Sequence, residues 1–354
     1  MEPRNPPEAP PSELDVNLLA GFTFGCRPDC GLCCFTSPRL EGDDEQRLRL
    51  AVPSVRIRNQ GGARCVAAHS GGGACTLLSR LRCTAHAARP APCREFPISV
   101  HVGTRLQASL VLSCPGVSLG PLRDFASTIP TPPLGLEAEL ASVRERITPA
   151  VERLRTDCTR RRRRIARQLA QQHRWMEDDE VRDRLRGRRL IPTADQYDPG
   201  ELPGVEDGLE RLPMFFDGRA GPVGLAHRTG GWEALELFPE GGAEPVGAAV
   251  PPDAPPSLDR AAEELLEGYL RYWVARDCFL AAIHHEMLSL AEGNVLETAL
   301  AQLQSIGSDV LARASFRTRL RGEAGTRLTA REIELGIRAT DLDWLDRPSW
   351  GSRL

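Results

Sequence analysis

Lysine is absent from the 354-residue sequence, so all 45 of its basic residues are arginine. A Schiff-base mechanism and a phosphate-binding P-loop each need a lysine, and both are therefore excluded. Aromatic residues are also scarce, at 5% of the chain, whereas the apolar fraction of 41% is enough for an ordinary globular core. The net charge of −3 points to no polyanionic or polycationic partner.

Long apolar segments are missing as well. No uninterrupted run of about 18 apolar residues occurs, so we expect no membrane-spanning segment and no membrane contact. The Pro-rich start lacks the apolar core of a secretory signal, and we expect residues 1–21 to be a flexible leader. These features predict a cytoplasmic protein. In that reducing compartment, dense cysteines are expected to bind metal or carry redox chemistry, because structural disulfides are rare there.

Sequence signatures of nucleotide binding and acyl transfer are also lacking. We find no Gly-rich dinucleotide fingerprint after a strand and no Gly-x-Ser-x-Gly elbow. No catalytic residue is therefore assigned, and whether the chain is an enzyme stays open at this point.

Cysteine, by contrast, is concentrated in one region. Nine of the 11 cysteines lie between Cys26 and Cys114, and only Cys158 and Cys278, which we assign to the core, lie elsewhere. Zinc and iron-sulfur centres take four soft ligands per site, and short cysteine spacings let one tight turn supply two of them. The clustering therefore predicts a metal-binding module at residues 22–117.

The adjacent pair Cys33 and Cys34 restricts the geometry. Consecutive side chains in extended backbone point to opposite faces, so the two thiols are not expected to share one mononuclear tetrahedral site. Either they face two centres, or one is a ligand while the other packs or is redox-active. Eight or nine thiols are enough for two four-thiolate sites or for one multinuclear cluster. Thiolate charge needs nearby donors, for which the candidates are Arg27, Arg39, Arg80, Arg82, Arg89 and Arg94.

The rest of the chain predicts helices and one small sheet. Residues 118–135 are rich in Pro and Gly and indicate a linker, and residues 136–174 show helical apolar spacing. Short apolar runs at about residues 212–250 are separated by turn signals and predict an antiparallel meander. Residues 101–113 alternate as a strand does.

Three further helices are expected near the C-terminal end. One spans residues 257–292, and two follow Asn294 and Thr329, each of which has a Glu three positions later, as in a capping box. The predicted fold class is therefore α+β, with an irregular Cys-rich metal-binding module followed by a mostly helical region, residues 136–354, that contains the meander.

Four segments taken together resemble the YkgJ-type cysteine-cluster family, described as zinc- or iron-chelating proteins. They are Cys30-Gly-Leu-Cys-Cys34, the spaced Cys75 and Cys83, Arg89-Pro-Ala-Pro-Cys-Arg-Glu-Phe-Pro97 and Cys114-Pro-Gly116. The resemblance implies a zinc or iron-sulfur centre. It also implies the metal ligands Cys26, Cys30, Cys33, Cys34, Cys75, Cys83, Cys93 and Cys114.

Two departures from the family pattern affect this ligand set. Three residues separate Cys26 from Cys30, whereas the family usually has two, and Cys65 is an additional thiol that could replace Cys26 or Cys75. The first hypothesis is a metal-binding protein with no assigned activity. Some relatives are described as flagellin lysine methylases, which implies a protein-modifying enzyme as one alternative, and a structural zinc module of an interaction protein is the other. We recognise no methyl-donor motif in this chain. The partner or substrate is an unidentified protein.

Other side chains carry weaker signals. Arg94 and Phe96 could neutralise and shield a metal centre, and His69, His86 and His101 are spare ligands. Residues 160–164 are five consecutive arginines, which could contact nucleic-acid phosphates, although a solvated helix is the simpler interpretation and we do not expect nucleic-acid binding. His284-His285-Glu286 lacks the spacing of a helical zinc motif.

Overall fold

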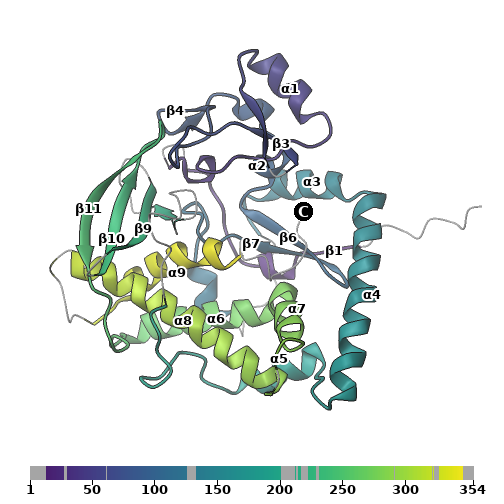
Figure 1. Ribbon diagram of the computed structural model, residues 1–354, viewed down its shortest axis with the longest axis vertical. Coiled ribbons are helices and arrows are strands. Elements are labelled where there is room, and N and C mark those ends of the chain that lie inside the picture. The colour runs from purple at the N-terminus through teal and green to yellow at the C-terminus, as the bar shows by residue number, and fades with distance from the viewer. Residues whose placement is uncertain are drawn as a thin grey trace, which may run out of the picture.

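The computed structural model describes residues 13–27, 30–60, 62–125, 133–200, 212, 214–216, 222–228, 231–290, 292–320, 322 and 327–345. Over these residues the fold is α+β, as predicted. Figure 1 shows the Cys-rich elements at one end of the molecule and the helices α6 to α9 at the other, with the antiparallel sheet β9 to β11 along one side.

The Cys-rich end consists of short elements joined by loops. Its helices are η2 (Leu32–Cys34), α1 (Asp44–Ala51), η3 (His86–Ala88) and α2 (Ala91–Glu95). Its strands form two antiparallel pairs, β2 (Ile57–Gln60) with β3 (Ala63–Val66) and β4 (Leu78–Ser79) with β5 (Arg82–Cys83). The irregular character expected for this region is consistent with these elements, none of which exceeds eight residues.

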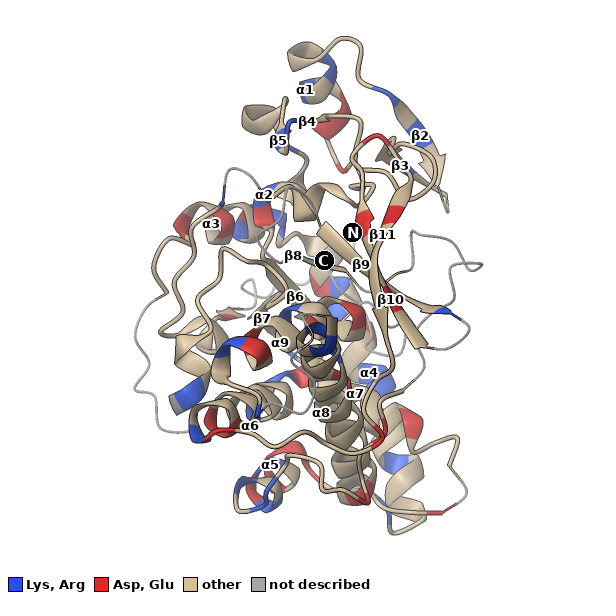
Figure 2. Ribbon diagram, turned by 90° about the vertical axis from the view of Figure 1, so that its left-hand side faces the viewer, with Lys and Arg blue, Asp and Glu red and all other residues tan. Residues whose placement is uncertain are grey.

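A three-stranded sheet joins this end to the helices (Figure 2). Strand β7 (Leu106–Leu110) lies between β1 (Leu14–Asp15), with which it is parallel, and β6 (Ile98–Val102), with which it is antiparallel. The single strand predicted at residues 101–113 is therefore wrong: a turn at residues 103–105 divides that segment between β6 and β7. The apolar alternation lapses at residues 103–105, which are Gly, Thr and Arg, and this interruption marks the turn.

Helices dominate the second half of the chain. After η4 (Gly120–Asp124) come α3 (Glu137–Arg146), α4 (Pro149–Gln171), α5 (Asp178–Arg186), α6 (Arg260–Ala275), α7 (Asp277–Glu286), α8 (Val295–Leu320) and α9 (Ala330–Leu345). The long helices predicted at residues 136–174 and 257–292 are each interrupted. The first breaks before Pro149, which occupies the first turn of α4, and the second breaks at Arg276, whose backbone is extended. None of the helices described is both long enough and apolar enough to cross a membrane.

The capping signals near the end of the chain are confirmed. Asn294 Oδ1 accepts a hydrogen bond from the backbone N–H of Glu297 at 3.0 Å. Glu332 accepts one from the backbone N–H of Thr329 at 3.0 Å, which is the reciprocal bond of a capping box. Both signals therefore mark the start of a helix correctly.

The predicted meander is present as a four-stranded antiparallel sheet. Strands β8 (Met214–Phe216), β9 (Pro222–Arg228), β10 (Gly231–Leu237) and β11 (Ala243–Ala249) follow one another in the order of the chain. One set of its side chains packs on α8, where the rings of Trp232 and Phe316 are 5.9 Å apart. Another set, including Leu235, packs against Phe35 of the Cys-rich end, so this sheet bridges the two ends.

One large apolar core crosses the predicted domain boundaries. It joins Leu19, Phe22 and Leu106 from the N-terminal part to Tyr272 and Trp273 of α6. Residues 14–19, within the predicted leader, form β1 and η1 (Asn17–Leu19) and belong to this core, whereas residues 1–12 lie outside the described residues. The Cys-rich module and the helical region are thus built on a common interior.

Candidate metal centre

All eight predicted ligands lie around two adjoining cavities. The first, of about 430 Å³, is lined by Cys26, Cys30, Cys33, Cys34, Cys75, Cys83 and Cys93, and we name it the Cys75 cavity. The second, of about 310 Å³, is lined by Cys26, Cys30, Cys33, Cys93 and Cys114, and we name it the Cys114 cavity. None of these thiols forms a disulfide. Segments nearly 90 residues apart in sequence therefore meet at one place.

The loop that carries Cys33 and Cys34 turns sharply at Gly31. Its φ of 60° lies in the left-handed region, and a Cβ there would come within 3.3 Å of Leu81, so glycine fits best at this position. Cys33 and Cys34 follow in the 3-10 helix η2, and their thiols hydrogen-bond to each other. The extended backbone assumed for this pair is therefore wrong, and both thiols line the Cys75 cavity. Residues 28 and 29 lie outside the described residues.

A tight hairpin brings Cys75 and Cys83 to the same cavity. The N–H of Cys75 donates to the carbonyl of Cys34 at 2.6 Å, which ties the two cysteine segments together. Leu78 pairs with Cys83 across β4 and β5, and the two turn residues Arg80 and Leu81 both have positive φ. A two-residue turn of this kind matches the twist of the two strands that it joins, and it leads the chain directly back to Cys83.

Cys93 is positioned by the short helix α2, which is anchored on a buried carboxylate. Asp44, 1% exposed, accepts a hydrogen bond from the backbone N–H of Ala91 at 3.1 Å and lies 3.7 Å from Arg94. Arg94 also donates to the carbonyl of Arg89 at 2.8 Å and lines neither cavity. The position of Arg94 therefore does not support the suggested role in neutralising thiolates. Its contacts hold α2 in place instead.

Arg89 is a guanidinium that acts on several of the thiols. It lines both cavities, and its Nε donates to the carbonyl of His86 at 3.1 Å. Its positive charge acts to lower the pKa of four cysteine thiols, Cys26, Cys33, Cys83 and Cys93. Of the six candidate arginines, Arg27 and Arg89 line both cavities and Arg82 lines the Cys75 cavity, whereas Arg39, Arg80 and Arg94 line neither.

Burial opposes ionisation of most of the cluster. It is the main cause that raises the pKa of Cys75 from 9.0 to about 11 and that of Cys114 to about 12, and each nearby thiolate adds to the effect. The exception is Cys33, whose pKa falls to about 7 because Cys34 donates a hydrogen bond to it. Several thiolates can exist together here only with added positive charge, which a metal centre supplies, so this soft donor set fits zinc or iron.

Cys65 lies apart from the other eight thiols. It is buried in β3, where its Sγ lies 3.9 Å from the carbonyl of Ala63, and it lines neither cavity. Its position therefore favours Cys26 and Cys75 over Cys65 as ligands. Of the three spare histidines, only His86 lines the cavities.

The Cys114 cavity also contains groups that the sequence did not single out. These are Glu137 and Glu139 from the start of α3. Phe96, which the sequence suggested as a shield for a metal centre, lines the same cavity. Burial raises the pKa of Glu139. No local signal marks these carboxylates, because they occupy ordinary first-turn positions of a helix. The cavity therefore combines thiols, carboxylates and an aromatic ring.

The thiols surround a space and do not converge on a point. Among the described residues, no three His, Cys, Asp or Glu side chains are close enough together to hold a single metal ion. Cys26, Cys30, Cys33 and Cys93 line both cavities, whereas Cys34, Cys75 and Cys83 line only the Cys75 cavity and Cys114 only the other. The ligand set is thus spread over two lobes.

Comparison with known proteins identifies the Cys-rich region. No curated protein and no solved structure gives a significant match to this chain. Residues 25–114, about a quarter of the chain, match the family model CxxCxxCC, described as "Putative zinc- or iron-chelating domain". All eight cysteines around the two cavities fall within the match. Over residues 25–114 the chain is therefore similar to the cysteine-cluster domain of the CxxCxxCC family model, which is described as zinc- or iron-chelating.

Proposed function

We propose that the eight cysteines hold an iron-sulfur centre and that this centre is the functional core of a cytoplasmic protein. The observation that carries the proposal is the spread of the thiols around cavities of about 430 and 310 Å³. A mononuclear zinc site needs four sulfurs at about 2.3 Å from one point. Iron-sulfur clusters place inorganic sulfide between their metals and so suit thiols that surround a wider space.

The two-lobed arrangement supports more than four thiolate ligands. Cys34, Cys75 and Cys83 belong to one lobe and Cys114 to the other, with Cys33 adjoining both. The charges of Cys75 and Cys83 act on Cys34 and Cys93, while that of Cys30 acts on Cys114. Two cubane-type or two-iron clusters, or one larger cluster, would each use this set.

The polar groups beside the thiols favour a reactive centre over a closed structural zinc site. Structural sites are enclosed by their ligands, whereas the Cys114 cavity also exposes Glu137, Glu139 and Arg89 to the space beside the thiols. This observation supports electron transfer or metal-dependent modification of a protein as the role of the centre.

Anaerobic purification followed by metal and acid-labile sulfide analysis tests the proposal. We expect iron and sulfide with a broad absorption band in the visible region. Cys93→Ser should remove most of the iron, whereas Cys65→Ser, a matched change at a buried cysteine outside the cavities, should retain it. Stoichiometric zinc in a colourless protein would contradict the iron-sulfur assignment and favour the structural module.

A further inference from the structure

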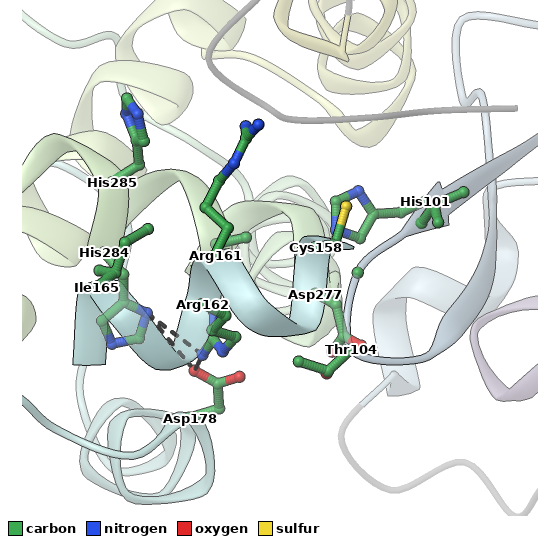
Figure 3. A pocket seen from close by; sticks show the side chains of 13 residues that line it. His101, Thr104, Cys158, Arg161, Arg162, Ile165, Asp178, Asp277, His284 and His285 are labelled. Atoms are coloured by element: carbon green, nitrogen blue, oxygen red, sulfur yellow. Dashed lines mark hydrogen bonds and ion pairs between the residues drawn. The ribbon is translucent and has the colours of Figure 1, made fainter. Parts of the chain in front are cut away.

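A separate pocket of about 170 Å³ lies between α4, α7 and the turn of the β6–β7 hairpin. Figure 3 shows residues from these elements around it, together with Asp178 at the start of α5. It shares no lining residue with the two cysteine cavities. The pocket is held on the hairpin side by Arg155 of α4, which donates to the carbonyl of Thr104 at 3.1 Å.

Both carboxylates of this pocket are already neutralised. Asp178 forms an ion pair with Arg162. Asp277 is bound by Arg105 at 2.6 Å and by Arg182 at 2.8 Å. Burial acts to raise the pKa of Asp277, yet these two guanidinium groups lower it overall. Neither carboxylate therefore has charge left for a cationic ligand.

Arg161 supplies the uncompensated charge of the pocket. Its side chain is exposed, and it forms no hydrogen bond or ion pair with the part of the chain that the structure describes. In Figure 3 it extends away from Asp178, toward the same side as His285, while Arg162 turns to Asp178. The two neighbouring arginines thus have different roles. Arg162 forms part of the pocket wall through its ion pair with Asp178, and the guanidinium of Arg161 can bind a ligand.

The remaining walls suit a short apolar group. Val102, Ile165 and Ala281 line the pocket. His284 is fixed as a wall, because its Nε2 lies 3.0 Å from the carbonyl of Met176 and its ring stacks on Trp175 with centroids 4.3 Å apart. The site therefore offers one positive charge beside an apolar surface.

We propose that this pocket binds a small monocarboxylate, with Arg161 as its charge partner and the apolar wall against its carbon chain. A doubly charged phosphate monoester fits less well, because a second free guanidinium would be needed and the other arginines at the pocket are paired with Glu152, Asp178 or Asp277. The proposal is independent of the metal centre and of its chemistry.

Cys158 also lines this pocket and is half-buried, so the rate at which its thiol is alkylated can report on binding in the pocket. Its alkylation by iodoacetate, a small carboxylate, can be compared with alkylation by neutral iodoacetamide, using peptide mass spectrometry on the full-length protein. Arg161→Gln should lower the iodoacetate-to-iodoacetamide rate ratio at Cys158 about tenfold, the effect of one charge-assisted hydrogen bond. Arg164→Gln removes the same charge from an exposed position of α4 outside the pocket and should leave the ratio unchanged.

Protection experiments complete the test. Butyrate should slow the labelling of Cys158, and butyramide, which has nearly the same shape without the charge, should not. The proposal would be overturned by any one of three results. These are an equal change of the rate ratio in the two variants, equal protection of Cys158 by butyrate and butyramide, and stronger protection by inorganic phosphate than by butyrate. If Cys158 reacts with neither reagent, calorimetric titration with butyrate replaces the labelling experiment. Saturable binding that is kept in Arg164→Gln and lost in Arg161→Gln supports the proposal. Absence of binding to the unmodified protein refutes it.

Discussion

Arg338 of α9 donates a hydrogen bond to the backbone carbonyl of Cys114, although 224 positions separate the two residues in the sequence. The same guanidinium donates to the carbonyl of Val117 at 2.9 Å and pairs with Glu334 at 2.7 Å. It is 5% exposed. The last described helix thus holds the loop that presents Cys114, so the helical region is part of the support for the candidate metal centre.

Replacing Arg338 should therefore affect both stability and metal content. Arg338→Met leaves the carbonyls of Leu112, Cys114 and Val117 and the carboxylate of Glu334 without their donor. We therefore expect the free energy of unfolding to fall by about 3 kcal/mol. Iron per chain should also decrease. Denaturant unfolding and metal analysis measure the two effects. Arg331→Met, at an exposed position of the same helix, is the control and should change neither quantity; an equal loss in both variants would refute the specific role of Arg338.

Arg89 should tune the electrochemistry of the proposed centre. Loss of a positive charge beside the thiols disfavours the more negative, reduced state, so Arg89→Gln should shift the midpoint potential to a more negative value. A potentiometric titration followed at the visible absorption band measures the shift. Arg39→Gln removes the same charge from an exposed position that lines neither cavity. Equal shifts in the two variants would show that only the overall charge matters.

Local patterns account for a large part of the fold and for the membership of the cluster. Capping boxes marked Asn294 and Thr329 correctly because their bonds involve residues three positions apart. The meander could be predicted from the sequence because strands that pair in the sheet are also neighbours in the chain. The resemblance to the cysteine-cluster family implied the eight thiols that surround the cavities.

Features set by distant contacts were not accessible in this way. The break between α6 and α7 occurs at Arg276, whose buried guanidinium binds Asp341 at 2.8 Å, and this partner lies 65 positions away. Arg89 and Arg94 are five positions apart and look equivalent in sequence, but only the packing of α2 on Asp44 determines which one faces the thiols. The free charge of Arg161 likewise depends on which of its neighbours meets Asp178.

The metal-free protein should lose stability at alkaline pH. Burial raises the pKa of Cys75 from 9.0 to about 11 and that of Cys114 to about 12, so the folded state keeps these protons when the unfolded chain has released them. Stability from these groups is fully present below pH 9.0 and is lost as the pH rises toward 11 and 12. The pKa of Cys33 is lowered to about 7, so this group makes the stability rise with pH between pH 7 and 9.0.

Metal should remove this alkaline loss, because bound cations take the place of the thiol protons. Denaturant unfolding of metal-free and metal-loaded protein, each below pH 9.0 and again between pH 9.0 and 11, compares the two cases. We expect a marked decrease with pH only in the metal-free protein. The same decrease in both forms would mean that Cys75 and Cys114 are not metal ligands.

Asp44 should be essential to the cysteine-cluster domain although it lines neither cavity. It accepts hydrogen bonds from the N–H groups of Glu41 at 3.0 Å and Ala91 at 3.1 Å and pairs with Arg47. Asp44→Ala leaves these donors unsatisfied in a buried position, and we expect a loss of about 3 kcal/mol in the free energy of unfolding, with release of metal from the displaced Cys93.

The neighbouring Asp43 provides the matched control for Asp44. Its side chain is 70% exposed and, within the described part of the chain, forms an ion pair with the same Arg47 at 3.4 Å, so Asp43→Ala should cost less than about 0.5 kcal/mol. Denaturant unfolding and metal retention during dialysis against a chelator measure both variants. If Asp44→Ala retains its metal as well as Asp43→Ala does, α2 is held by other contacts and Cys93 does not depend on this carboxylate. The expected difference arises because the charge at position 44 is buried beneath the helix that carries a ligand, whereas that at position 43 faces solvent.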